Sequence, residues 1–80
     1  MKTIDVIKNR ILSLCEEHKL TINALAEISA LPPSSLKNIL YGKSRNPGIV
    51  TLKMLCDGLG ITLTEFFGTE EFEKLEQEIK

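Results

Sequence analysis

Apolar residues recur at intervals of three and four along most of the chain, which is the spacing of one face of an α-helix. The pattern predicts a first helix over 4–18, with Thr3 as its N-cap and Asp5 in its first turn. It predicts a second helix over 22–28, which Thr21 can cap through its hydroxyl group. The buried face of the first helix would comprise Ile4, Ile7, Ile11, Leu14 and Cys15.

Two adjacent prolines, Pro32 and Pro33, interrupt this pattern. A proline inside a helix removes an amide donor and clashes with the preceding turn, whereas the first helical position tolerates it. We therefore expect a third helix from Pro33 to a stop at Gly42, followed by a polar loop over 43–48. The buried face of this helix would comprise Leu36, Ile39 and Leu40.

A fourth helix is predicted to end near Gly58 or Gly60. Thr62 and Glu65 then have the spacing of a capping box, in which each side chain accepts the backbone amide of the other residue. This signature predicts a short fifth helix, which Gly68 ends. The buried face of the fourth helix would comprise Ile49, Leu52, Leu55, Cys56 and Leu59.

The last segment, 69–80, is strongly acidic, and Thr69 can cap it as a helix. One side of that helix would carry the apolar residues Phe72, Leu75 and Ile79. No segment alternates apolar and polar residues as a strand does. The expected fold class is therefore all-α, a compact bundle of five or six short helices, with 1–68 as the main domain and 69–80 as an acidic helical extension.

Length and composition limit the chain to one small domain. It has 80 residues, 42% of them hydrophobic, which is enough for one core and no second domain. No apolar run approaches the ~20 residues that span a bilayer, and no signal peptide is visible. We therefore expect a cytoplasmic protein that has no membrane partner.

The chain offers little chemistry for catalysis. It has one histidine, no glycine-rich phosphate loop and no Ser-His-acid set, so we expect neither enzyme activity nor a cofactor. Cys15 and Cys56 lie among apolar residues at helical spacing and are expected to be reduced core thiols. The alternative, a metal site completed by His18, supplies three ligands where structural zinc takes four. His18 fits better near a helix C-terminus.

Charge is distributed unevenly along the chain. Residues 1–58 hold eight basic and five acidic side chains, whereas residues 59–80 hold two basic and six acidic ones. The stretch 28–56 has no acidic residue at all, and its cations are Lys37, Lys43, Arg45 and Lys53. Such a stretch suits a phosphate backbone, which attracts cations and neutral donors. The alternative is a solvated face that lacks acids, and charge alone does not decide between them.

The segment 22–41 carries a recognisable motif: two helices joined by a short turn, with the small residue Ala26 on the first helix. Apolar residues follow at fixed offsets, namely Leu31, Leu36 and Ile39. Gly42 ends the second helix of the motif, and a basic loop with Pro47 comes next. This arrangement resembles the helix-turn-helix of the phage-repressor (Xre/Cro-like) family, over roughly 4–67. The resemblance implies a lambda-repressor-like fold that binds double-stranded DNA.

Three positions depart from the family pattern. Ala30 stands where the family usually has glycine, and a left-handed conformation there would cost ~1 kcal/mol. Pro32 stands at the N-cap of the third helix and has no side-chain acceptor, so Ser34 is an alternative cap. Ile22 replaces a glutamine that touches phosphate in several relatives.

The resemblance also implies which residues meet DNA. The third helix would enter the major groove and place Pro33, Ser34, Lys37 and Asn38 against base edges. Asn38 can contact adenine with two hydrogen bonds, and Lys37 can donate to guanine or to phosphate. The alternative for both is plain solvent exposure.

Other residues match positions that grip the DNA backbone. They are Lys43, Ser44 and Arg45, with Ser35 and Tyr41 as further candidate phosphate donors. For Tyr41, burial of the ring against the loop is an equal alternative.

Relatives of this kind act as two-fold dimers on palindromic sites, so the resemblance implies a small repressor that forms a homodimer. The expected dimer interface is Phe67, Phe72, Leu75 and Ile79, whereas Phe66 is expected in the monomer core. In the alternative, the last segment folds back over its own monomer. A competing hypothesis is a protein-interaction module, such as an antitoxin-like partner, on the same fold.

Overall fold

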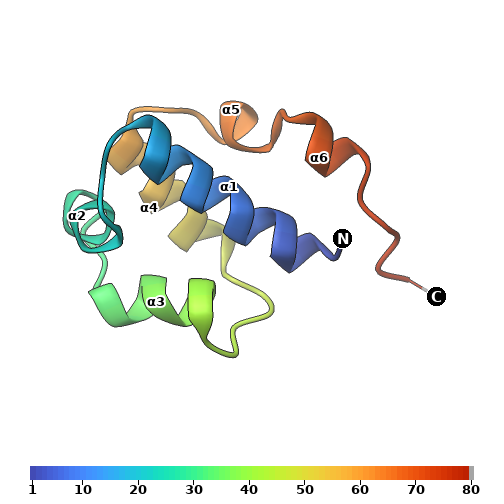
Figure 1. Cartoon of the computed structure of the whole chain (residues 1–80), viewed down its shortest axis with the longest axis horizontal. Coiled ribbons are helices and arrows are strands. Elements are labelled where there is room, and N and C mark those ends of the chain that lie inside the picture. Colours follow the sequence, from blue (N-terminus) through green and yellow to red (C-terminus); the bar gives the residue numbers. More distant parts are fainter. Residues whose placement is uncertain (80) are drawn as a thin grey trace.

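The computed structural model describes residues 1–79, and within them the chain is helical, with no strand. The six helices are α1 (Thr3–Glu17), α2 (Ile22–Ile28), α3 (Pro33–Tyr41), α4 (Ile49–Leu59), α5 (Leu63–Phe67) and α6 (Glu70–Glu73). The all-α fold is as predicted. α1 runs across the molecule with α4 behind it, α2 lies at the left, α3 lies below, and α5 and α6 lie above (Figure 1). No helix in the described residues is long and apolar enough to cross a membrane.

Local capping sets several helix ends where the sequence predicts them. The Thr21 hydroxyl accepts the amide of Ala24 at 3.0 Å and begins α2. The Thr62 hydroxyl accepts the Glu65 amide, and the Glu65 carboxylate accepts the Thr62 amide, both at 3.0 Å. This capping box begins α5. Gly60 adopts a left-handed conformation with φ of 72° and ends α4, so the stop falls at Gly60 and not at Gly58.

The start of α1 differs from the prediction. Thr3 is not the N-cap but the first helical residue, because the Lys2 carbonyl already accepts the amides of Asp5 and Val6 at 3.0 and 3.2 Å. The Thr3 hydroxyl donates instead to the Glu78 carboxylate. At the other end, α1 stops at Glu17 and His18 is its C-cap.

The third helix begins at Pro33, with Pro32 in an extended conformation as its N-cap. Pro32 has no side chain to accept a hydrogen bond, and Ser34 does not take over this role. The fixed φ of proline suits the first helical position, so the helix starts there without a side-chain cap.

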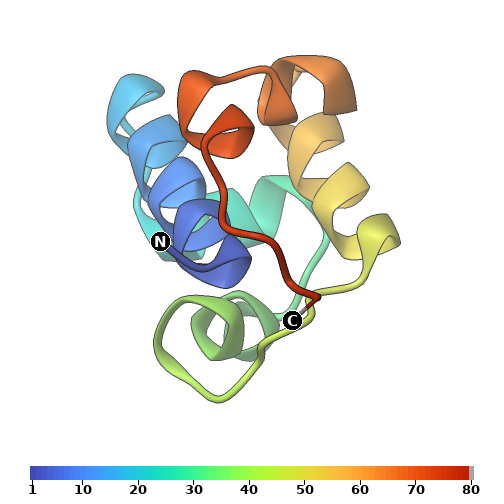
Figure 2. The same cartoon turned by 90° about the vertical axis from the view of Figure 1, so that its right-hand side faces the viewer.

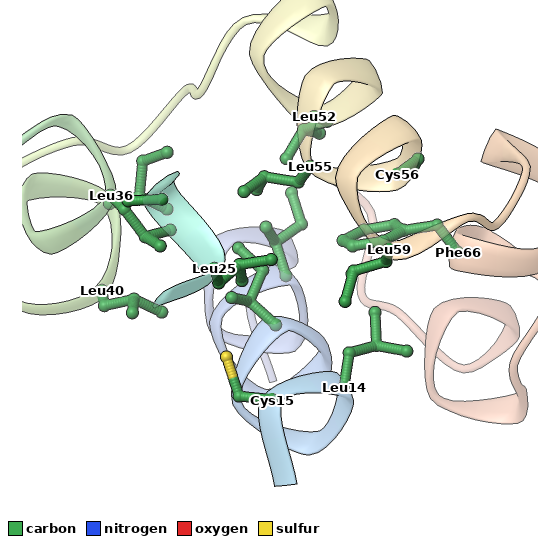
Figure 3. Close-up of a cluster of buried hydrophobic side chains, with 14 residues drawn as sticks. Leu14, Cys15, Leu25, Leu36, Leu40, Leu52, Leu55, Cys56, Leu59 and Phe66 are labelled. Carbon is green, nitrogen blue, oxygen red and sulfur yellow. The ribbon is translucent and has the colours of Figure 1, made fainter. Parts of the chain in front are cut away.

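The five helices from α1 through α5 share one apolar core, and Figure 3 shows side chains from all five converging in it. Its largest fully buried side chains are Phe66, Ile11, Leu25, Leu36, Leu55 and Cys56. Phe66 is therefore a core residue, as predicted. Cys15 and Cys56 are free buried thiols, and burial raises the pKa of each. No group of three or more candidate metal ligands occurs among residues 1–79.

The C-terminal segment is less helical than its sequence pattern predicts. α6 ends at Glu73, and residues 74–79 follow without helical structure, so the predicted stripe does not form. Phe72 packs against Phe67, with ring centroids 5.0 Å apart. Beyond Phe72, Leu75 is half-buried and Ile79 is 82% exposed. A short helix is stable only where it packs against the rest of the protein. In this segment only α6 does so, through Phe72, and the helix ends there.

Candidate nucleic-acid interface

A tight turn joins α2 to α3. The Leu31 amide donates to the Ala26 carbonyl at 2.9 Å, and the Ala30 amide donates to the Glu27 carbonyl at 3.1 Å. These two bonds define a Schellman motif, in which the residue after the C-cap is left-handed. Ala30 occupies that position with φ of 56°, so the strain expected from the missing glycine is present.

The turn places α3 so that one face is buried and the other is open. Leu36, Ile39 and Leu40 are buried, and Leu36 has no exposed surface. The opposite face is exposed along the whole helix and comprises Pro33, Ser34, Lys37, Asn38 and Tyr41. Their spacing of three and four residues accounts for this shared face. The structure therefore brings the four predicted base-reading residues together on the surface of α3.

Two further candidates of α3 have different surroundings. Ser35 is half-buried, at the edge of the exposed face. The Tyr41 side chain is 67% exposed, so the alternative in which its ring is buried against the loop is wrong. Tyr41 lies at the end of α3, beside Gly42, whose amide donates to the Asn38 carbonyl at 3.0 Å.

The loop after α3 presents two cations to solvent. Lys43 and Arg45 are exposed, Ser44 between them is half-buried, and neither cation forms an ion pair within residues 1–79. Lys53, the other cation that follows α3 in the acid-free stretch, pairs instead with Asp57 on the next turn of α4. The positive charge of the stretch is therefore concentrated on α3 and the loop.

Two features of the N-terminal part of the chain were not predictable from the sequence. Lys2 and Lys8 line the same open hollow as Lys43 and Arg45, although they lie far from them along the chain. Arg10 is not a free surface cation, because its guanidinium donates to two backbone carbonyls at the end of α5. A contact with a backbone carbonyl depends on the fold, so no sequence motif could have revealed it.

Comparison with known proteins identifies the family. A family model described as the Cro/C1-type HTH DNA-binding domain matches residues 10–71. A solved structure, the crystal structure of the prophage Lp1 protein 11, matches with a TM-score of 0.80 and 29% identity, covering 94% of this chain and 100% of that chain. No curated protein matches this chain. The chain belongs to the Cro/C1-type helix-turn-helix family, which confirms the predicted resemblance and makes DNA its ligand.

Proposed function

We propose that this chain is a small transcriptional repressor that reads the sequence of double-stranded DNA through α3. The observation that carries the proposal is the exposed face of α3. Ser34, Lys37 and Asn38 lie on it, and their side chains make no hydrogen bond within residues 1–79. Their donors and acceptors are thus available for a partner.

Each side chain on this face has a distinct role in the proposal. Asn38 contacts adenine with two hydrogen bonds, and Lys37 donates to guanine or to a nearby phosphate. Ser34 donates or accepts at a base edge, whereas Pro33 supplies only van der Waals contact, for instance with a thymine methyl group.

The loop and the ends of the exposed face hold the DNA backbone in this proposal. The contacting residues are Lys43, Ser44 and Arg45, with the hydroxyl groups of Ser35 and Tyr41 as additional donors. The exposure of the two unpaired cations supports this assignment, because phosphate contacts need accessible positive charge.

Repression follows from occupancy of DNA, and we propose a homodimer on a palindromic site. A single α3 reads only a few base pairs, and two-fold symmetry doubles the contact. The proposed interface is at the C-terminal end of the chain. It comprises the exposed parts of Phe67, Phe72, Leu75 and Ile79.

The experiment is selection from a library of random duplexes by the full chain, followed by binding measurements on the enriched sequence. The proposal expects a palindromic consensus whose half-sites lie about one helical turn apart. The control is Asn38→Ala, which should show a weaker preference for the consensus than the wild-type chain. If no sequence is enriched, the chain does not read DNA bases.

Sedimentation equilibrium tests the dimer separately. The wild-type chain should be a dimer at tens of micromolar, and Leu75→Ser combined with Ile79→Ser should be a monomer. Glu16→Ser on the far end of α1 is the control. If the wild-type chain and the double variant are both dimers, the interface lies elsewhere. If both are monomers, the proposed homodimer is wrong.

A second candidate function is a protein-interaction module on the same fold. The observation that favours it is apolar surface at the start of α4, where Ile49 is 58% exposed and Val50 is 70% exposed. Exposed apolar residues side by side suit a protein partner. Salt dependence separates the two functions, because affinity for a duplex falls steeply with salt in proportion to the phosphates contacted.

A further inference from the structure

The two ends of the chain are joined at the surface. After α6, residues 74–79, which we call the acidic tail, run past the N-terminal end of α1. The Thr3 hydroxyl donates to the Glu78 carboxylate at 2.6 Å, and the N-terminal ammonium group lies 3.9 Å from a Glu76 carboxylate oxygen. Figure 2, in which this segment lies nearest the viewer, shows it running down from α6 beside the N-terminal end of α1.

This path brings carboxylates to the edge of the DNA-facing surface. Glu76 and Glu78 line an open hollow whose other walls are the start of α1 and the loop after α3. The cations on those walls, which we call the basic strip, are Lys2, Lys8, Lys43 and Arg45. Carboxylates that share a hollow with cations lower the positive potential that attracts phosphate.

The contacts that hold the tail are of a kind that DNA can displace. The side chains of Glu76 and Met1 are 74% and 56% exposed, and exposed ion pairs are weak. Residues 74–79 form no helix, and Phe72, which anchors the segment to the core, lies before them. The side chains of Glu76 and Glu78 can therefore leave the hollow while the core and the proposed interface at Leu75 and Ile79 stay in place.

We propose that the acidic tail competes with DNA phosphates for the basic strip and so lowers the affinity of the chain for DNA. The inference rests on the proposed phosphate contacts of Lys43 and Arg45, and it adds Lys2 and Lys8 to the same surface. The carboxylates of Glu76 and Glu78 then act as an intramolecular substitute for DNA phosphates, and a duplex displaces these two side chains when it binds.

The main test compares two charge-matched variants of the full chain by fluorescence anisotropy with a labelled random-sequence duplex at low salt. Glu76→Gln combined with Glu78→Gln should bind about three- to tenfold more tightly than wild type, and the gain should shrink as salt screens it. Glu71→Gln combined with Glu73→Gln makes the same charge change on α6, outside the hollow, and should gain less than about twofold. Equal gains from both pairs would overturn the proposal in favour of a general charge effect.

A charge-neutral variant tests the position of the tail. Thr3→Val removes the hydroxyl that holds Glu78 and changes no charge, so it should also tighten binding. The gain from the glutamine pair should be much smaller when Lys43→Ala and Arg45→Ala are present, because two of the four cations of the basic strip are then missing. Unchanged affinity in Thr3→Val, or a full gain without Lys43 and Arg45, would overturn the proposal.

The outcomes separate this inference from the function on which it rests. If wild type binds duplex in a manner that needs Lys43 and Arg45 but the glutamine pair changes nothing, the tail does not compete and the DNA contacts stand. If neither wild type nor any variant binds duplex at low salt, both proposals are wrong.

Discussion

Gly42 packs directly against Asn38, one turn earlier on α3. A Cβ atom at position 42 would fall 2.8 Å from the Asn38 carbonyl oxygen and 2.9 Å from its Cα, and would collide with the side-chain amide oxygen. The same carbonyl accepts the Gly42 amide at 3.0 Å. The missing side chain at 42 thus sets the position of the residue that we propose to read adenine.

We expect Gly42→Ala to destabilise the fold by about 1–3 kcal/mol, because the methyl group overpacks the end of α3. Urea unfolding followed by circular dichroism measures this change. Gly48→Ala is the matched control, since a Cβ there would meet only the Thr51 hydroxyl at 4.0 Å. Equal losses in the two variants would show that the close approach to Asn38 is unimportant.

Asn38→Ala should weaken binding to the selected duplex by about 1–3 kcal/mol and leave random-sequence binding nearly unchanged. The reason is that a bidentate base contact distinguishes sequences, whereas a phosphate contact does not. Competition binding with both duplexes measures the two affinities. Equal losses on both duplexes would contradict the base-reading role.

Lys43→Ala and Arg45→Ala should each weaken binding to every duplex and reduce the slope of log affinity against log salt by about one unit. Each removes one cation that would displace a counterion from the DNA. Lys19→Ala, on an exposed cation at the end of α1, is the control and should leave the slope unchanged. A slope unaffected by either loop substitution would mean that the loop does not touch phosphate.

Ala30→Gly should stabilise the protein by about 0.5–1 kcal/mol, because glycine adopts the left-handed conformation without steric cost. The gain is limited because glycine loses more conformational entropy on folding. Lys19 has the same φ of 56° at the end of α1, so Lys19→Gly should behave alike. Thermal unfolding measures both. Gly60→Ala, at the third residue with a positive φ, should lower the stability, and a gain in stability there would contradict the argument.

The two buried thiols predict a pH dependence of stability. Burial raises the pKa of Cys15 and Cys56 above its ordinary value of 9.0, so the folded state holds these protons more tightly than the unfolded state. Their stabilising contribution is complete below pH 9.0 and is lost as the pH rises through the folded-state pKa. Alkylation at pH 8.5 should therefore be much slower in buffer than in urea, and equal rates would contradict the burial.

The sequence predicted best those features that depend on neighbours along the chain. The caps at Thr21 and Thr62 and the stop at Gly60 are local hydrogen bonds or backbone preferences, so residue type and spacing suffice. The exposed face of α3 follows from helical periodicity for the same reason.

Features that depend on distant contacts were not predictable in this way. Thr3 fits an N-cap by sequence, yet its hydroxyl bonds to Glu78, which only the folded chain brings near. The path of residues 74–79 likewise depends on α1. The periodic apolar pattern predicted a longer last helix there. A short helix also needs a surface to pack against, and the pattern alone does not show whether the fold provides one.

The hydrogen bonds from Arg10 to α5 have a consequence for local unfolding of the protein. Its Nε donates to the Phe66 carbonyl at 2.8 Å and its Nη2 to the Glu65 carbonyl at 2.9 Å, so a residue of the first helix closes the end of the fifth. Phe66 is at the same time fully buried in the core. α5 therefore cannot detach as a separate unit without uncovering the core and breaking both hydrogen bonds to Arg10. Amide hydrogens in α1 and α5 should therefore exchange through one shared opening event, as expected of two helices that belong to a single cooperative unit.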